Sequence, residues 1–240
     1  MKAVDNLKKV YMIRHGQSIW NHDSKFTGWT NIPLTDNGRK EAKIIANTLI
    51  NNEIYPNVFF SSVLQRAIDT SNIIKKEFKM HTHNTEIRTY TSWRLNERHY
   101  GSLEGVPRQY IRDAYGDKFT EMMRSNFYMK PPVLKDIQNK VTDYKIYRNC
   151  YYNEKKNGES KEDVYERLMP YFQNDIMYTL SENMTPIIVT HKHCARVLMK
   201  YLLKLDDEGF ENYNIKSKHI YELIFNMEDE FMDYKEIPYN

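Results

Sequence analysis

Two histidines stand directly after apolar runs that have the length of short buried strands. His15 follows residues 10–13 (VYMI) with Arg14 in between, and His191 follows residues 186–190 (PIIVT). Unbroken apolar runs are expected where both faces of a strand are covered, as in a parallel sheet. Because ligands of open α/β sheets bind outside the carboxyl ends of the strands, we expect the two imidazoles to face one site.

Arginines are expected at the same edge of the sheet. A third strand is predicted at residues 57–62 (NVFFSS), and Arg66 lies near the start of the helix that follows it. Guanidinium groups match phosphate oxygens through paired hydrogen bonds, and a helix N-terminus adds backbone N–H groups, so Arg14, Arg66 and the two imidazoles indicate a phosphate site. His15 could attack phosphorus while the other imidazole, protonated, stabilises the equatorial oxygens. We expect Gly16 to let the backbone approach the anion.

Helical patterns separate the predicted strands. Apolar residues spaced by three and four predict a helix that is capped by Thr35 or Asp36. Ser62 and Gln65 fit a capping box that opens a second helix, which reaches about Phe78. Strands that alternate with helices over short connections predict an α/β fold with a parallel sheet.

The middle of the chain has no clean strand periodicity. From about residue 94 to residue 160, short helical patterns occur only at residues 107–114 and 117–127, and a polar, aromatic, proline-marked stretch follows. Such a long irregular connection is usually functional or mobile, and both an ordered insertion over one end of the sheet and a flexible lid remain open. We therefore expect a single domain over residues 1–240 with an irregular insertion at about 94–160.

Regular patterns return in the last third of the chain. Ser160 and Asp163 fit an N-terminal cap for a helix over residues 160–181, and another helix follows the second histidine. Residues 220–225 and 231–237 predict two final strands, which could form a hairpin.

The composition is ordinary for a soluble globular protein and does not indicate a nucleic-acid partner. Hydrophobic residues make up 40% of the 240 residues and charged residues 28%. The 35 basic and 32 acidic residues leave a formal net charge of +3, which is too small to indicate nucleic acid but suits a local cationic pocket.

Cysteine usage and hydropathy indicate the cytoplasm. Cys150 and Cys194 lie far apart without CxxC spacing, so neither a disulfide framework nor a zinc site is expected, and such usage suits a reducing compartment. No apolar run approaches the roughly 18 residues that a membrane span needs, and residues 1–9 lack the apolar core of a signal peptide. We expect a cytoplasmic protein with no metal and no membrane partner.

Taken together, the motifs resemble a known family. The chain resembles the histidine phosphatase superfamily, and within it the cofactor-dependent phosphoglycerate mutases, in the segments RHGQSIWN, KFTGW, PLTDNG, SSVLQRA and LNERHYGSLEG. The resemblance covers about residues 10–225, and FTGW and LNERHYG are much more specific to the mutase branch than RHG. It implies a three-layer α/β sandwich, with a mostly parallel central sheet flanked by helices.

The resemblance also implies roles for residues that match the family's motifs. His15 would form the phosphohistidine, Arg14, Arg66 and His191 would surround the phosphoryl group, and Glu97 would exchange a proton with the substrate hydroxyl. Without the motif, Glu97 would be interpreted as an ordinary ion-pair partner of Arg94 or Arg98. The substrate-binding residues that the resemblance implies are Asn21, Thr27, Gly28, Tyr100, Arg108 and Arg124.

Several positions depart from the family's pattern. Arg108 stands where lysine is usual, and Ser125 replaces the second arginine of a pair that grips the substrate carboxylate. After the second histidine the family has Gly-Asn-Ser and this chain has Lys192, His193 and Cys194. Lys192 could supply a compensating cation or point to solvent, and we slightly favour solvent.

Two further departures lie near the C-terminus. Residues 214–225 (NIKSKHIYELIF) stand where the family has a Pro-Thr-Gly turn, and the sequence ends without the basic, glycine-containing tail that helps to close mutase sites. A mutase must keep water away from its phosphohistidine, so both departures favour loss of the phosphoryl group to water.

Three functions therefore stay open, in this order. The first is a phosphoglycerate mutase that interconverts 3- and 2-phosphoglycerate in glycolysis, primed by 2,3-bisphosphoglycerate and independent of metal. The second is a histidine-type phosphatase that hydrolyses small phosphate esters through the same phosphohistidine. The third is a catalytically weak relative that binds a phosphorylated ligand or a protein. The expected partners are small phosphorylated sugar acids, with a homodimer or higher homo-oligomer as a further possibility.

Overall fold

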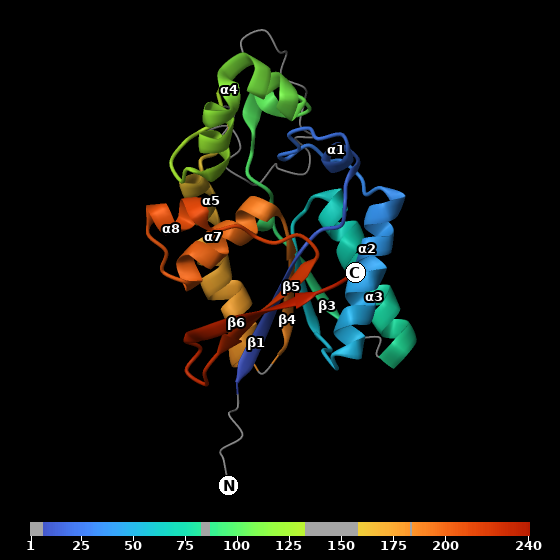
Figure 1. The fold of residues 1–240 in the computed structure, drawn as a ribbon. Coiled ribbons are helices and arrows are strands. Elements are labelled where there is room, and N and C mark those ends of the chain that lie inside the picture. The colour runs from blue at the N-terminus through green and yellow to red at the C-terminus, as the bar shows by residue number, and fades with distance from the viewer. Residues whose placement is uncertain (1–6, 83–86, 133–157, 183) are drawn as a thin grey trace.

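The structure is a computed structural model that describes residues 7–82, 87–132, 158–182 and 184–240. Its centre is a sheet in which six strands of the described residues lie in the order β3-β2-β4-β1-β5-β6 (Figure 1). The four strands from β3 to β1 run parallel, and β5 and β6 continue the sheet as antiparallel strands. The strands are β1 (Lys8–Arg14), β2 (Val58–Ser61), β3 (Arg88–Thr91), β4 (Pro186–Thr190), β5 (His219–Phe225) and β6 (Phe231–Pro238).

Helices cover both faces of this sheet. In Figure 1, α2 and α3 lie on one side, α5 and α7 lie on the other, and α1 and α4 lie beyond the end at which β1 and β4 finish. No helix among the described residues is long and apolar enough to cross a membrane. The helices are α1 (Ile19–His22), α2 (Asp36–Asn51), α3 (Gln65–Thr82), α4 (Arg108–Ser125), α5 (Lys161–Tyr171), α6 (Met177–Ser181), α7 (Lys192–Leu202) and α8 (Asp207–Asn212), with short 3-10 turns at Trp93–Leu95 and Gly101–Leu103 and a π-helical segment at Phe172–Ile176.

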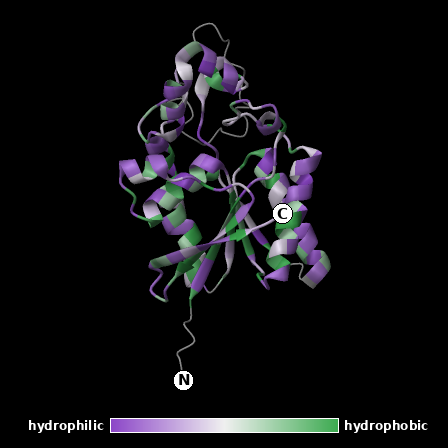
Figure 2. Cartoon of the chain, in the orientation of Figure 1, coloured by the Kyte–Doolittle hydropathy of each residue, from purple (hydrophilic) through white to green (hydrophobic). Residues whose placement is uncertain are grey.

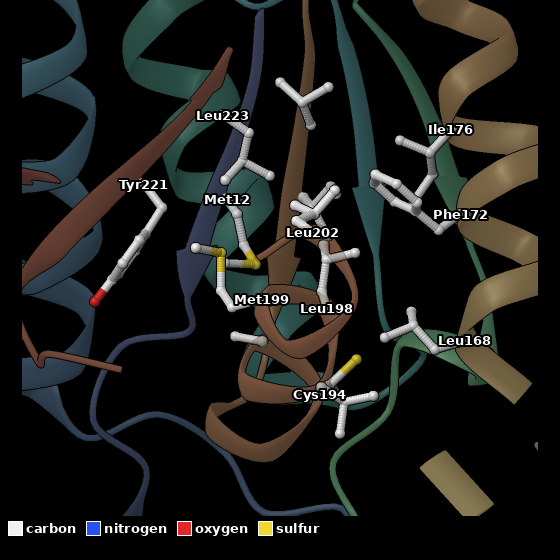
Figure 3. Packing of buried hydrophobic residues seen from close by; sticks show 14 of the residues in the cluster. Met12, Leu168, Phe172, Ile176, Cys194, Leu198, Met199, Leu202, Tyr221 and Leu223 are labelled. Carbon is white, nitrogen blue, oxygen red and sulfur yellow. The ribbon is translucent and has the colours of Figure 1, made fainter. Parts of the chain in front are cut away.

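The alternation of side chains along β1 divides the core into two layers. Met12 packs with α5 and α7, whereas Tyr11 and Ile13 pack with α2 and α3. Figure 3 shows the first layer, in which Leu198 and Met199 lie beside Met12. Burying an aliphatic side chain of this size stabilises the fold by roughly 1.5–3 kcal/mol. The hydrophobic colours of Figure 2 follow the central strands, whereas β6, an edge strand with no fully buried residue, is mainly hydrophilic.

This architecture confirms the predicted three-layer α/β sandwich with a mostly parallel sheet. The strands expected at residues 57–62, 186–190, 220–225 and 231–237 form, and the last two pair as an antiparallel hairpin. Thr35 caps α2 by accepting a hydrogen bond from the N–H of Gly38, as the sequence predicted.

Three local differences have physical causes. The predicted capping box of Ser62 and Gln65 is wrong, because α3 begins at Gln65 and the Ser62 hydroxyl contacts His191 instead. Strand β3 was not predicted, since its four residues RTYT are exposed and carry no apolar run. The helix at residues 160–181 is interrupted by the π-helical segment, which follows Pro170, a residue without an N–H to donate.

The predicted insertion is described in part. The two helical patterns at 107–114 and 117–127 form the two halves of α4, which is broken at Gly116, where φ is 82° and ψ is 163°. Residues 133–157, with Cys150, lie outside the described residues. The single domain over residues 1–240 therefore stays a prediction.

Candidate active site

Strand register brings the two histidines together. Strands β1 and β4 are parallel neighbours with Arg14 opposite Thr190, and the N–H of His15 donates to the Thr190 carbonyl at 3.0 Å. His15 and His191 therefore leave the sheet side by side, with ring centroids 4.8 Å apart and planes tilted by 57°. Both rings are buried.

His15 is held as a neutral imidazole with a defined tautomer. Its Nδ1 lies 2.6 Å from the carbonyl oxygen of Gly16, and because a carbonyl only accepts, Nδ1 carries the proton. Burial, first, and the guanidinium groups of Arg66 and Arg14 lower the pKa of His15 well below its usual value. A neutral ring with its proton on Nδ1 has a lone pair on Nε2, which is the state that a nucleophile needs.

His191 takes its orientation from Ser62. Its Nε2 lies 2.7 Å from the Ser62 hydroxyl, which also accepts the N–H of Leu64 at 3.3 Å. When the hydroxyl donates to Nε2, the ring proton of His191 is on Nδ1, a buried atom with no hydrogen-bond partner among the described residues.

His191 is neutral in the free protein. Burial, first, and the guanidinium groups of Arg66 and Arg14 lower its pKa well below the usual value. The expectation of a protonated second imidazole concerns the state with a phosphoryl group bound, and it stays a prediction. The Nδ1–H group can still donate a hydrogen bond to an anion.

Arg66 is fixed by a loop that precedes it by more than 30 residues. Its guanidinium donates to the carbonyl oxygens of Gly28 at 2.7 Å and Thr30 at 3.0 Å, and its side chain is buried. Glu104 holds that loop by accepting from the backbone N–H groups of Trp29 and Thr30, both at 2.9 Å. Gly28 has φ of 53°, and a Cβ there would lie 1.9 Å from a Glu104 oxygen. The carboxylate of Glu104 therefore requires glycine at this position.

Arg14 makes no side-chain hydrogen bond or ion pair with the described residues, whereas Arg66 donates to two carbonyl oxygens. The Nε atom of Arg14 is buried, and the side chain lines the cavity beside His15. A buried N–H without an acceptor is costly, so Arg14 is suited to an anionic ligand.

Gly16 is needed for the packing of the loop. A Cβ at Gly16 would lie 2.3 Å from the carbonyl oxygen of Gly38 in the first turn of α2. Its N–H donates to the Thr70 hydroxyl at 3.1 Å, and that hydroxyl donates to the Arg66 carbonyl. Close approach of two backbones therefore requires glycine here, and the expectation that Gly16 also admits the anion stays a prediction.

Glu97 is anchored at the start of α7. One oxygen of its carboxylate accepts the N–H of Arg98 at 2.9 Å and the N–H of His193 at 3.2 Å. The alternative ion pairs of Glu97 with Arg94 or Arg98 do not form among the described residues, since the guanidinium of Arg98 donates to three carbonyl oxygens instead. The carboxylate is thus left facing the cavity.

A buried ion pair holds the segment that carries Glu97. Arg167 and Glu159 contact each other through two hydrogen bonds of 2.9 and 3.0 Å. Arg167 also donates to the carbonyl oxygens of Asn96 and Glu97, and Glu159 accepts the N–H of His99. These contacts could not be predicted from local sequence patterns, because Glu159 and Arg167 lie some 60–70 residues from the segment that carries Glu97.

Two buried basic side chains likewise hold the end of α4, which carries Arg124. Lys161 donates to the carbonyl oxygens of Met123 and Asn126 at 3.0 and 2.7 Å, and Arg196 donates to the Arg124 carbonyl at 3.0 Å. Burial, first, lowers the pKa of Lys161 to about 5, so it acts as a neutral hydrogen-bond donor to the last carbonyl groups of the helix. The main chain of Arg124 is thereby fixed at the cavity wall.

All but one of the predicted site residues line a single cavity of about 120 Å³. His191 is the exception, and it lies against His15. Three lining residues were not among those predictions: Phe26, Lys192 and His193. The ring of His193 accepts from or donates to the hydroxyl of Tyr100 at 2.8 Å. The lining residues are Arg14, His15, Asn21, Phe26, Thr27, Gly28, Arg66, Glu97, Tyr100, Arg108, Arg124, Lys192 and His193.

The expected solvent orientation of Lys192 was wrong. Its side chain is half-buried in the cavity wall, where burial, first, and the charges of Arg124 and Arg14 lower its pKa to about 8. No group of three or more His, Cys, Asp or Glu side chains that could hold a metal ion occurs among the described residues.

Comparison with known proteins identifies the class. A model of the histidine phosphatase superfamily (branch 1) matches residues 10–234. Among solved structures, a mycobacterial glucosyl-3-phosphoglycerate phosphatase in complex with VO3 has a TM-score of 0.71 at 22% identity, over 97% of this chain and 99% of that chain. A structure described as mycobacterial hydrolase 1 has the same TM-score at 20% identity, over 96% and 97%. These two structures share the fold, and the matched model places the chain in the superfamily.

Sequence relatives narrow the class. The 2,3-bisphosphoglycerate-dependent phosphoglycerate mutase of Buchnera aphidicola subsp. Cinara cedri is 38% identical over 213 residues, which are 88% of this chain and 90% of that protein. The enzyme of the same description from Hydrogenobaculum sp. is 35% identical over 85% of this chain and 81% of its own. Within the histidine phosphatase superfamily, the chain belongs to the family of 2,3-bisphosphoglycerate-dependent phosphoglycerate mutases.

Proposed function

We propose that this protein interconverts 3-phosphoglycerate and 2-phosphoglycerate through a phosphohistidine on His15. The state of His15 carries the proposal: a neutral ring with its proton directed at Gly16 and its Nε2 lone pair available, beside the guanidinium groups of Arg14 and Arg66. The descriptions of the sequence relatives support the choice of substrate.

Glu97 is the proposed proton carrier for transfer from His15 to substrate. As the C2 hydroxyl of 3-phosphoglycerate attacks phosphorus, an O–P bond forms, the N–P bond to His15 breaks, and Glu97 takes the hydroxyl proton. Arg14, Arg66 and the Nδ1–H of His191 would stabilise the charge on the equatorial oxygens.

The return transfer uses the same groups in reverse. Nε2 of His15 attacks the phosphoryl group on the C3 oxygen, an N–P bond forms as the P–O bond breaks, and Glu97 returns its proton to the leaving oxygen. Because Glu97 is held by two backbone N–H groups, it stays at one place in the wall through both transfers. The net result is 2-phosphoglycerate and a phosphorylated His15.

The residues at the site also fit the primer that the family uses. 2,3-Bisphosphoglycerate would supply the phosphoryl group that first charges His15. Arg14, whose buried Nε lacks an acceptor among the described residues, and Arg66 would hold that phosphoryl group. Asn21, Thr27 and Gly28 line the same cavity.

Remaining substrate contacts are proposed at the walls of the cavity. Tyr100, Arg108 and Arg124 line it and would contact the glycerate part of the substrate. We infer a cytoplasmic location, where such small phosphorylated sugar acids are used. We also propose that the protein forms a homodimer, which light scattering can test.

Product analysis tests the proposal. The purified protein is incubated with 3-phosphoglycerate and a trace of 2,3-bisphosphoglycerate, and 2-phosphoglycerate is measured, with His15→Ala as the control. Formation of 2-phosphoglycerate by the unaltered chain alone is expected, and its absence would contradict the proposal. Acid-labile phosphate on the intact protein, lost in His15→Ala, would also exclude the non-catalytic binding alternative.

A phosphatase is the second candidate, favoured by a second opening to His15. A cavity of about 350 Å³ shares Arg14 and His15 with the first and extends to residues 216–219 and Tyr239. Water that enters there could attack the phosphohistidine. Release of inorganic phosphate faster than isomerisation would favour this candidate, and dominant isomerisation on both phosphoglycerates would exclude it.

A further inference from the structure

Two cationic side chains, Arg124 and Lys192, lie where the cavity opens beside α8. The cavity shares Arg124, Lys192 and His193 with this opening, and it shares Arg14, His15, Asn21 and Arg108 with the opening toward residues 216–219. These two openings have no lining residue in common. Arg124 and Lys192 therefore lie at a second end of the cavity, distinct from the end that opens toward residues 216–219, and we call this end the second pole.

The ammonium group of Lys192 has no direct partner among the described residues. Lys192 is the first residue of α7, where the positive end of the helix dipole disfavours a cation. Its ammonium group forms no ion pair or hydrogen bond with the described residues, and Arg124 forms no ion pair with them either. Two neighbouring cations in a half-buried wall repel each other, which an anionic ligand would relieve.

The main chain around Lys192 is fixed relative to the proposed chemistry. The N–H of the next residue, His193, donates to the carboxylate of Glu97, so the first turn of α7 is tied to the proton carrier. Ser125, the neighbour of Arg124, is uncharged, and its hydroxyl donates to the Glu121 carbonyl at 3.0 Å. The second cation at this pole therefore comes from α7 rather than from the end of α4.

We propose that Lys192, together with Arg124, binds the carboxylate of the substrate and thereby determines specificity for phosphorylated sugar acids. The inference rests on the proposed function, because it places the carboxylate of the proposed substrate at the second pole of the cavity that contains His15. With a phosphoryl group at His15, a carboxylate at this pole satisfies both sets of cations with one molecule.

The charged groups that face Lys192 define its pH behaviour. Three are guanidinium groups, of Arg124 on α4, Arg14 on β1 and Arg196 on α7, and one is the carboxylate of Glu97. His193 is also close, but burial lowers its pKa well below the usual value, so it stays neutral. Since the pKa of Lys192 is about 8, its ammonium charge is present below that pH and is lost above it.

Calorimetric binding tests the proposal without turnover. Two ligands are compared, 3-phosphoglycerate and glycerol 3-phosphate, which has the same phosphate but no carboxylate. Lys192→Met is expected to weaken binding of 3-phosphoglycerate about tenfold, the usual effect of losing one charge-assisted hydrogen bond, and to leave binding of glycerol 3-phosphate unchanged. Lys118→Met, which removes an exposed lysine of α4, is the matched control and should alter neither.

The pH dependence gives an independent readout. Affinity of the unaltered protein for 3-phosphoglycerate should fall between pH 7 and 9.5, Lys192→Met should lose this dependence, and Lys192→Arg should stay tight at both pH values. Equal affinities of Lys192→Met and the unaltered protein, or equal losses for both ligands, would overturn the inference. Selective binding without any 2-phosphoglycerate formation would instead refute the proposed function and leave this inference standing.

Discussion

Ser62 should control the rate of phosphoryl transfer although it does not line the cavity. Its hydroxyl lies 2.7 Å from Nε2 of His191, and its side chain is fully buried. In Ser62→Ala, Nε2 loses its donor, so the tautomer with the proton on Nδ1 is no longer selected and a buried acceptor is left unpaired. Such a loss costs roughly 1–3 kcal/mol, which corresponds to a rate lowered roughly 5- to 150-fold.

The neighbouring Ser61 supplies a matched control. Its hydroxyl is also buried and donates to the Ser62 carbonyl at 3.0 Å, but it does not contact His191. Single-turnover phosphorylation of His15 by 2,3-bisphosphoglycerate gives the transfer rate, and thermal unfolding gives the stability. We expect both alanine variants to lose similar stability and only Ser62→Ala to lose rate. Transfer rates within about twofold of each other would refute the role of Ser62 as a positioning residue.

Three further predictions concern pH, the glycine-bearing loop and metals. The pKa values of His15, His191 and His193 are lowered in the folded protein, so below the usual histidine pKa of about 6.5 the unfolded chain binds more protons than the folded one. The free energy of unfolding should therefore fall as the pH drops below that value, by roughly 1.4 kcal/mol per pH unit for each histidine. Urea unfolding at several pH values measures this change. A constant stability from pH 6.5 to 5 would contradict the neutral state of these rings. Gly28→Ala should displace the loop from Glu104, raise KM for the phosphorylated substrate and lower Tm, and an unchanged KM would show that the loop does not hold Arg66. Isomerase activity should persist in excess EDTA, and a chelator-sensitive enzyme assayed in parallel serves as the control. Loss of isomerase activity in EDTA that Mg²⁺ restores would contradict the metal-free mechanism.

The predictions from sequence succeeded where one local pattern determines one feature. The apolar run of β4 and the Thr35 cap of α2 depend on neighbouring residues, so periodicity and capping rules found both. The convergence of His15 and His191 also followed, because parallel neighbours end at one edge of the sheet.

The failures involve contacts between distant segments. Ser62 looked like a helix cap in isolation, but its partner lies 129 residues away. The orientation of Lys192 depends on how α7 and α4 meet, and no local pattern encodes that packing. The neutral state of His191 in the free protein results first from the burial of its own ring and then from neighbouring guanidinium groups, which residue types alone do not reveal.

The close approach of Gly16 and Gly38 has a consequence for how this sequence can change over time. A side chain at Gly16 would meet the Gly38 carbonyl at 2.3 Å, and one at Gly38 would meet the Gln17 carbonyl at 2.1 Å. Neither glycine becomes replaceable when the other is replaced, because each obstruction is main chain. A substitution at either position is tolerated only if α2 shifts as a whole relative to β1. The loop that carries His15 and the start of α2 can therefore change in sequence only together, because a substitution in one of the two glycines requires a shift of the other segment.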